Sequence, residues 1–286
     1  MDNFINFETL LTEEERLIQQ TIREFVDAEF LPVITHHYRN GTFPVDLVPR
    51  LADLGVFGAT LHEYDLPGLT TVPYGLIMLE LERGDSGLRS MVSVQNSLVI
   101  FPIHNWGSRE QKDYWIPRLA AGKAIGCYGL TEPDFGSNPG GMRTTYKKNG
   151  SAYVLNGSKA WITNGSTADV AVVWARGEDG SVRGFLVERD TPGFESRSYP
   201  GKYSLRASDT SELFFQDVEL DEDHVLPGTG SLRHPLQCLT EARFGISWGA
   251  IGAALAVSNH ALEYARSRIQ FRGKPIASRS DAHTSE

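Results

Sequence analysis

The sequence predicts an α+β protein in which a helical segment, a β-sheet segment and a second helical segment follow one another. Apolar residues recur at helical spacing through residues 1–123. From 124 to about 226 the period falls to nearly two, and tight turns separate β-branched and aromatic runs. A mostly apolar helical pattern returns near residue 235. Runs of helices and then of strands, rather than their alternation, are typical of this class.

The helices of the first segment carry clear start and stop signals. Thr12 and Glu15 have the spacing of a capping box, and apolar residues then recur every three or four positions. The stretch VDLVPRLADLG predicts a short helix that stops at Gly55, because glycine adopts the left-handed conformation easily. Two strongly apolar stretches predict buried helices, and Ser108 with Gln111 predicts a second capping box.

The middle segment, 124–234, is expected to be an antiparallel sheet domain. The stretch MRTTYKKNGSAYVLNGSKAWITNG contains three Asn-Gly pairs, and DVAVVWARGEDGSVRGFLVERD contains an Asp-Gly pair. Both residues of such a pair tolerate positive φ and suit two-residue hairpins. We therefore expect a turn at each pair.

The last segment is expected to be one long helix over 235–272, followed by a disordered tail over 273–286. Small residues recur among larger apolar ones in this helix, which suits close approach of a neighbouring helix. The final nine residues, SRSDAHTSE, have no apolar periodicity. A helix this apolar needs a partner, which is either the first domain or another subunit.

Composition excludes several classes of protein. The net charge is −9, which argues against general binding to nucleic acid or to an anionic membrane. No apolar run approaches the roughly 18 residues that span a bilayer, and the acidic start MDNFINFETLLTEEE is unlike a signal or transit peptide. We therefore expect a soluble intracellular protein. Cys127 and Cys238 lack metal-ligand spacing, so no metal site is expected and both thiols are expected to be buried.

Two stretches of the middle segment have the chemistry of a ligand site. CYGLTEPDFGSNPGG is rich in backbone N–H groups and hydroxyls that can face a ligand, and KAWITNG places an aromatic ring beside a hydroxyl. Together they can hold a flat, polar-edged ring by stacking and hydrogen bonds. Spacing alone equally fits an ordinary turn and a core tryptophan, and it favours that simpler interpretation. The common phosphate-binding loops are missing, since GTGSLR has two of three Rossmann glycines and the wrong context.

Four stretches together resemble the flavin-dependent acyl-CoA dehydrogenases. YGLTEPDFGS, NGSKAWITN, KYSLRASDT and FQDVELDEDHVLPG occur in the order and at the spacing of that family's signatures. The resemblance extends over nearly the whole chain up to SRIQF. It is closer to glutaryl-CoA dehydrogenases through ELERGDSGLRSMVSVQNSLV and CLTEARFGISWGAIGAA. It implies a helical domain, a β domain with the flavin site, and the start of a C-terminal helical domain.

The resemblance implies an FAD cofactor and assigns residues to its binding. One side of the isoalloxazine would lie along the loop after the first strand, the other under the aromatic strand end, and an arginine would reach a flavin phosphate across a subunit boundary. The residues are Tyr128, Gly129, Leu130, Thr131, Gly136, Ser137, Trp161, Ile162, Thr163 and Arg268.

The resemblance also implies contacts with the substrate. Ser137 and Arg243 fall where the family contacts the acyl-CoA, and Arg89 and Ser90 with Glu82 match the pocket for the distal carboxylate of glutaryl-CoA. A dicarboxylate needs a fixed cation with fork geometry. Simpler alternatives are a solvated helix-end role for Arg89 and surface pairs of Glu82 with Arg83 or with lysines. Arg243 has the alternative of a structural pair with Glu241 or Glu80.

The implied reaction is α,β-dehydrogenation of glutaryl-CoA with decarboxylation to crotonyl-CoA, as in lysine and tryptophan degradation. Electrons would pass to electron-transfer flavoprotein, and the family is usually tetrameric. The family's catalytic glutamate lies in a C-terminal bundle beyond this sequence, so no catalytic residue is assigned and a truncated domain is expected. One alternative is therefore a truncated paralogue or splice form without turnover, and another is a short-chain acyl-CoA dehydrogenase with a different substrate. The compartment implied is the cytoplasm in a prokaryote or the mitochondrial matrix in a eukaryote.

Overall fold

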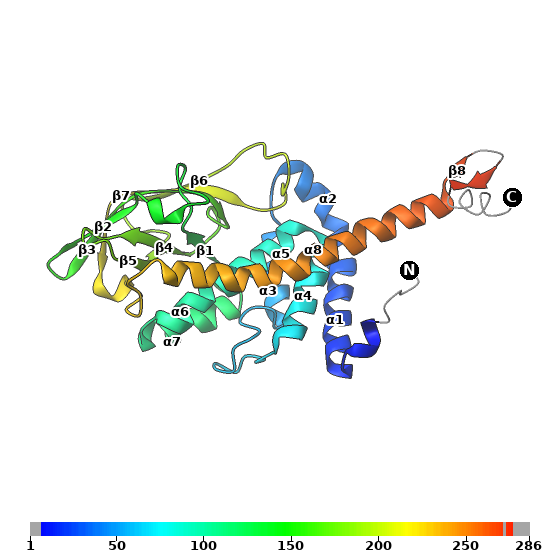
Figure 1. Cartoon of the computed structure of the whole chain (residues 1–286), viewed down its shortest axis with the longest axis horizontal. Coiled ribbons are helices and arrows are strands. Elements are labelled where there is room, and N and C mark those ends of the chain that lie inside the picture. The colour runs from blue at the N-terminus through cyan, green and yellow to red at the C-terminus, as the bar shows by residue number, and fades with distance from the viewer. Residues whose placement is uncertain (1–6, 271–272, 277–286) are drawn as a thin grey trace.

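The computed structural model describes residues 7–270 and 273–276. A group of helices from the N-terminal part lies beside a β-sheet, and one long helix runs along both (Figure 1). This order of helices, sheet and helix is the predicted α+β architecture. Part of the expected disordered tail at 273–286 is ordered, since Lys274–Pro275 form strand β9, and residues 277–286 lie outside the described residues.

The N-terminal part consists of seven α-helices among the described residues. The capping box at Thr12 is confirmed, because its Oγ1 accepts the Glu15 N–H at 3.2 Å and the Glu15 carboxylate accepts the Thr12 N–H at 2.8 Å. Ser108 and Gln111 form the second one. Gly55 has φ +69°, the predicted left-handed stop. The helices are α1 (Glu13–Phe25), α2 (Leu31–Asn40), α3 (Val48–Asp53), α4 (Thr71–Gly84), α5 (Ser86–Ser93), α6 (Phe101–Trp106) and α7 (Arg109–Ala120).

Two of these helices are continued by π-helical turns that the sequence pattern did not indicate. The segment Val26–Phe30 joins α1 to α2, and η4 (Val94–Ile100) joins α5 to α6. A π turn adds a residue to a helical turn and is frequent at functional sites. In this chain η4 packs on the first strand of the sheet.

The middle part is a seven-stranded sheet, and its topology corrects the prediction of a purely antiparallel one. The strands pair in the order β1-β4-β2-β3-β7-β6, and β5 pairs with β4. β1 and β4 are parallel, because the β2–β3 hairpin returns the chain to the edge of β1 in the same direction. The strands are β1 (Gly126–Gly129), β2 (Thr145–Asn149), β3 (Ala152–Thr163), β4 (Val170–Arg176), β5 (Val182–Glu188), β6 (Phe194–Ser198) and β7 (Thr210–Asp221).

Most of the predicted turns form, but one does not. The pairs at 149–150 and 179–180 turn the β2–β3 and β4–β5 hairpins, and the pair at 164–165 follows β3. The prediction of a turn at Asn156 and Gly157 was wrong, since both lie inside β3 at a break in its register with β7. The Asn156 side chain there accepts the Asp217 N–H at 2.9 Å and donates to the Asp217 carboxylate at 3.0 Å. An irregular strand therefore uses the φ tolerance that usually makes a turn.

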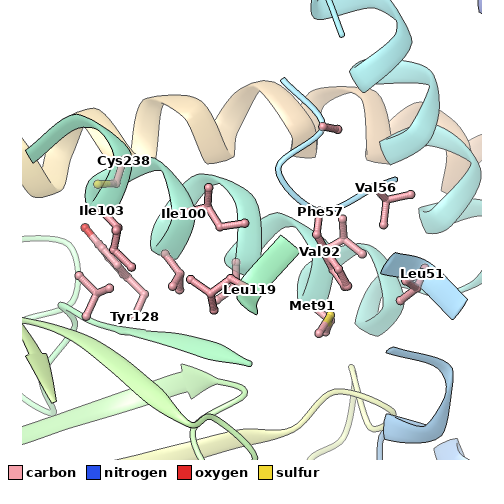
Figure 2. Close-up of a cluster of buried hydrophobic side chains, with 14 of the residues drawn as sticks. Leu51, Val56, Phe57, Met91, Val92, Ile100, Ile103, Leu119, Tyr128 and Cys238 are labelled. Atoms are coloured by element: carbon pink, nitrogen blue, oxygen red, sulfur yellow. The ribbon is translucent and has the colours of Figure 1, made fainter. Parts of the chain in front are cut away.

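The sheet separates two apolar cores. Alternate residues of β4 point to opposite faces, so that Val172 and Trp174 join the helices while Val173 packs into the second core with β5 and β7. Figure 2 shows part of the first core, with Tyr128 from β1 and Cys238 from the long helix at one end. Both cysteines are buried, as predicted.

The long helix α8 (Arg233–Ser267) is shorter at its C-terminal end than predicted. Residues 269–270 are not helical but form β8 (Ile269–Gln270), which pairs with β9 (Lys274–Pro275). Pro275 cannot continue a helix and Gly273 has φ +74°, which suits the turn. α8 packs on α4, and three of its buried residues that lie against α4 are glycines: Gly245, Gly249 and Gly252. This confirms the close helix approach that the small residues predict.

Candidate active site

A cavity of about 320 Å³ lies where η4, the sheet and α8 meet. Four segments line it: η4, β1 with the loop after it, the end of β3, and the first turns of α8. The lining combines apolar side chains with hydroxyls and one cation, as in many small-molecule sites. Its residues are Val94, Leu98, Tyr128, Leu130, Thr131, Gly136, Ser137, Pro139, Trp161, Ile162, Thr163, Leu236, Leu239 and Arg243.

The cavity brings together eight of the ten residues assigned to the flavin. The two others lie elsewhere. Gly129 is buried in β1, where a Cβ would lie 3.2 Å from Lys159 Cγ. Arg268 follows the last residue of α8, and the 24 residue steps from Arg243 to Ser267 correspond to roughly 36 Å of helix. Within one copy of the chain, Arg268 therefore lies far from the cavity.

A buried ion pair joins the two main walls of this cavity. Lys159 on β3 is fully buried, and its Nζ donates to Glu132 Oε1 at 2.9 Å and to the Leu130 carbonyl at 3.1 Å. The Glu132 carboxylate also accepts the backbone N–H groups of Arg143 and Thr144, at 2.6 and 2.9 Å. The loop after β1 is thus fixed to the strand that carries the aromatic wall.

Burial sets the protonation of this pair. Loss of water lowers the pKa of Lys159 to about 8, although the adjacent Glu132 carboxylate raises it. Burial alone would raise the pKa of Glu132, but Lys159 and the two backbone N–H groups outweigh burial and lower it. Both groups are therefore charged at neutral pH. No local sequence pattern indicates this pair, because lysine side chains are usually exposed.

The aromatic wall is a bulge at the end of β3. Lys159 pairs with Leu213 and Ile162 with Ser211, so two residues of β3 stand opposite Glu212 alone. One of them is Trp161, which has φ +61° and a 62% exposed side chain. The simpler interpretation of Trp161 as a core residue is thus wrong. The bulge also explains why Trp161, Ile162 and Thr163 all line the cavity, which strict alternation would not allow.

Tyr128 closes the cavity toward α8. Its ring is buried and its hydroxyl donates to the Pro235 carbonyl at 3.0 Å. Burial raises the pKa of this phenol well above its usual value, so it stays a neutral donor. The contact joins β1 to the first turn of α8.

The residues assigned to a distal carboxylate form their own cluster between α4, α5 and α8. Glu82 and Arg89 make an ion pair with both side chains about 90% buried. Ser86 donates to the Glu82 carboxylate, and Ser90 follows Arg89 on α5, half-buried. Gly249 of α8 lies against the pair, because a Cβ there would be 2.9 Å from Glu82 Oε2. None of these five residues lines the cavity.

The structure decides three of the simpler alternatives for these charges. Arg89 is buried, not a solvated helix-end residue. Arg83 pairs with Glu80 and Asp27 at 2.7 Å each, so it is not the partner of Glu82. The alternative partner Glu80 of Arg243 is already occupied, because its carboxylate is fully buried against Arg83 and Arg23. Arg243, an exposed residue, instead contributes to the cavity wall.

Sequence reasoning missed five apolar residues of the cavity. Two come from η4, one from the loop after β1, and two from the first turns of α8: Val94, Leu98, Pro139, Leu236 and Leu239. Each of these fits an ordinary core pattern. Only the three-dimensional meeting of η4, β1 and α8 distinguishes them.

The described residues contain neither a cluster of metal ligands nor a membrane-spanning helix. Within residues 7–270 and 273–276, no group of three histidine, cysteine or acidic side chains is placed to hold a metal ion. In the same part of the chain, no helix is long and apolar enough to cross a bilayer.

Comparison with known proteins identifies the family. Residues 12–123 match the model of the acyl-CoA dehydrogenase N-terminal domain, and residues 127–218 match that of the acyl-CoA dehydrogenase middle domain. The chain is 36% identical to an acyl-CoA dehydrogenase of Bacillus subtilis (strain 168) over 274 residues, which cover 93% of this chain and 72% of that protein. The chain belongs to the acyl-CoA dehydrogenase family.

Two other acyl-CoA dehydrogenases show the range of substrates among similar proteins. A glutaryl-CoA dehydrogenase from Mycobacterium smegmatis, solved in complex with FADH2, has a TM-score of 0.94 and 49% identity over 98% of this chain and 72% of that one. The human mitochondrial short-chain specific acyl-CoA dehydrogenase is 35% identical over 93% of this chain and 66% of that protein. Members of the family are FAD-dependent oxidoreductases that act on CH–CH bonds. The chain spans about two thirds to three quarters of the length of these relatives.

Proposed function

We propose that this chain binds FAD in the cavity and that it takes part in the α,β-dehydrogenation of an acyl-CoA of glutaryl type. The observation that carries the proposal is the convergence in one cavity of the loop after β1, the aromatic end of β3 and Arg243. These segments are far apart in the sequence and include eight of the residues assigned to the flavin. The alternative of an ordinary turn and a core tryptophan does not account for this convergence.

The lining fits the chemistry of an isoalloxazine ring. Trp161 offers an exposed indole for stacking, and Thr131, Ser137 and Thr163 offer hydroxyls to the polar edge of a ring. Gly136 leaves open space, since a Cβ there would meet no atom within 4 Å. A cavity of about 320 Å³ suits the ring system rather than a whole dinucleotide. We keep Arg268 as a proposed phosphate contact for the flavin of a neighbouring subunit.

The cofactor and the protein contribute different parts of the proposed chemistry. When bound, FAD supplies the acceptor for the hydride that leaves the β-carbon of the acyl chain. Trp161 and the loop after β1 orient the ring, while the apolar residues of η4 and α8 exclude water. Arg243 and Ser137 are proposed to contact the acyl-CoA. Among the described residues we assign no general base for the α-proton.

The Glu82–Arg89 pair is the proposed determinant of specificity. It lies against Gly249, six residues beyond Arg243 on α8, which is about 9 Å of helix. A buried guanidinium in fixed orientation is the group that best recognises a second carboxylate. Glu82, whose carboxylate also accepts the Ser86 hydroxyl, holds Arg89, and Ser90 is proposed as an additional donor. A short monocarboxylic acyl-CoA is the second candidate substrate, favoured by the likeness to the human short-chain enzyme.

The remaining expectations are kept as proposals. The domains are 1–123, 124–234 and 235–272, with 273–286 as a tail. Electron-transfer flavoprotein is the proposed electron acceptor, the assembly is a homotetramer, and the location is the bacterial cytoplasm or the mitochondrial matrix. Decarboxylation to crotonyl-CoA is part of the proposed glutaryl-CoA reaction.

The first test is flavin binding by the purified 286-residue chain. When FAD is titrated with the apoprotein, we expect the flavin fluorescence to decrease until it saturates. The mixture should also show the visible absorbance of a bound flavin. Anaerobic addition of glutaryl-CoA should then bleach this absorbance. Bound flavin that no acyl-CoA bleaches would favour the alternative of a binding protein without turnover, and absence of binding would contradict the proposal.

A matched pair of glycine variants locates the site. Gly136→Val adds a side chain at the cavity wall without an internal clash and should weaken FAD binding at least about tenfold. Gly230→Val is the control, because a Cβ there also meets nothing within 4 Å but the residue does not line the cavity. Equal binding by both variants would place the flavin elsewhere.

Specificity is tested by neutralising the buried pair as a unit. Glu82→Gln with Arg89→Met removes the cation without leaving an unpaired buried carboxylate. We expect glutaryl-CoA to bind the flavin-loaded double variant about ten- to a hundredfold more weakly, and butyryl-CoA to bind nearly as before. Calorimetric titration measures both. If the affinities for both ligands fall equally, the carboxylate pocket is misassigned. A short monocarboxylic acyl-CoA then becomes the better candidate substrate.

A further inference from the structure

The indole of Trp161 has an aromatic partner outside the cavity. Its ring stacks on that of Tyr199, with centroids 4.4 Å apart and planes inclined by 17°. Trp161 lines the cavity, whereas Tyr199 does not. The indole thus lies between the cavity and Tyr199.

Three neighbouring strands bring these groups together. Trp161 lies in the bulge of β3, Glu212 is the residue of β7 opposite that bulge, and Tyr199 directly follows β6 on the other side of β7. The Tyr199 hydroxyl donates to Glu212 Oε1 at 3.0 Å, and its backbone N–H donates to the Thr210 carbonyl at 2.8 Å. Both ends of Tyr199 are therefore anchored to β7.

The stack on Tyr199 restricts the movement of the Trp161 side chain. An exposed side chain in a bulge can move away from a ligand ring that it stacks on. Fixing that side chain when the ligand binds costs conformational entropy. Stacking on an anchored ring removes that freedom in advance. Burial and the hydrogen bond to Glu212 raise the pKa of Tyr199 to about 12, so the phenol remains a donor throughout the physiological range.

We propose that Tyr199, anchored by Glu212, is a positioning residue that holds the Trp161 indole as a preformed wall of the flavin site. The inference rests on the proposed function, since it names what orients one wall of that same site. Tyr199 does not line the cavity, so it acts only through Trp161.

The test compares Tyr199→Leu with Tyr203→Leu, a control four residues along the same connection whose side chain is fully exposed. Flavin affinity is measured by titration of FAD into each apoprotein. We expect Tyr199→Leu to weaken FAD binding about three- to tenfold, and the control to leave it unchanged. Tyr199→Phe keeps the stack but loses the bond to Glu212, so an intermediate affinity is expected.

A second readout separates this inference from the proposed function. All five tryptophans lie in the described part of the chain, and Trp161 is the only one with an exposed side chain. Acrylamide quenching of the apoprotein, corrected with Trp161→Phe, therefore reports the order of the Trp161 indole without any flavin. Quenching of Trp161 should rise in Tyr199→Leu and not in Tyr203→Leu. Unchanged quenching, or increased quenching with unchanged FAD affinity, would overturn the positioning role. Failure of the parent chain to bind FAD would instead overturn the proposed function, while quenching still decides whether Tyr199 orders Trp161.

Discussion

Replacing Lys159 by methionine is expected to lower the free energy of unfolding by about 3 kcal/mol. The change leaves the Glu132 carboxylate buried without its cation, and breaking one side of a buried pair typically costs this much. Two backbone N–H groups still solvate Glu132, which keeps the loss at the lower end. Urea unfolding followed by circular dichroism measures the difference.

A double-mutant cycle distinguishes the ion pair from simple packing. Lys159→Met combined with Glu132→Gln removes both charges, and we expect the double variant to be at least about 1 kcal/mol more stable than the sum of the two single losses predicts. Additive losses would contradict coupling between the two side chains. A loss below about 1 kcal/mol in Lys159→Met alone would contradict the buried charge itself.

The same pair predicts how stability depends on pH. Folded Lys159 loses its proton near pH 8, whereas the unfolded chain holds it up to 10.5. Between these values the unfolded state binds more protons, so the contribution of Lys159 to the free energy of unfolding rises by roughly 1 kcal/mol per pH unit. Lys159→Met lacks this titrating group. The difference in the free energy of unfolding between the parent and Lys159→Met should therefore grow from pH 8 to pH 9. The contribution of Glu132, whose pKa is lowered on folding, is present above pH 4.5 and is lost as the pH falls through its folded pKa.

Gly252→Ala is expected to destabilise the chain by about 2 kcal/mol or more. A Cβ at this position of α8 would lie 2.0 Å from the Leu79 carbonyl oxygen, so the backbones of α8 and α4 must move apart. This cost exceeds the gain of about 1 kcal/mol that alanine brings to a helix interior. Thermal and urea unfolding of the purified variant measure the loss.

The matched control is Gly245→Ala, two turns earlier on the same buried face of α8. Its Cβ would meet side chains rather than backbone: the flexible Met78 side chain at 3.2 Å, and Ser93 Oγ at an ordinary contact distance of 3.9 Å. We expect a change of less than about 1 kcal/mol, in either direction. Similar losses at both positions would show that helix geometry, and not contact with α4, explains the glycines.

Local signals made the helices predictable from the sequence. The capping boxes at Thr12 and Ser108 and the stop at Gly55 depend on residues three or fewer positions apart, and all three form as predicted. The parallel pairing of β1 with β4 depends on strands more than 40 residues apart, and no local pattern encodes it. The same applies to Lys159, whose burial follows from the loop that folds over it.

The candidate site was predictable in its segments but not in its geometry. The two stretches around Tyr128 and Trp161 were identified by composition and resemblance, and the structure brings them together. The bulge at Trp161 was not foreseen, because alternation predicts one residue on each face in turn. The π turn that presents Leu98 carries no sequence signature that an ordinary apolar helix lacks.

The position of Lys159 two residues before Trp161 on β3 has a thermodynamic consequence for ligand binding. One strand holds the loop on one side of the cavity through a buried ammonium and the aromatic wall on the other side through its bulge. Both walls are therefore connected through β3 in the structure without a ligand. A ligand that enters this cavity therefore pays little ordering entropy, so its affinity should depend mainly on contacts and desolvation. We expect binding to show a negative heat-capacity change that reflects buried ligand surface rather than the folding of a loop.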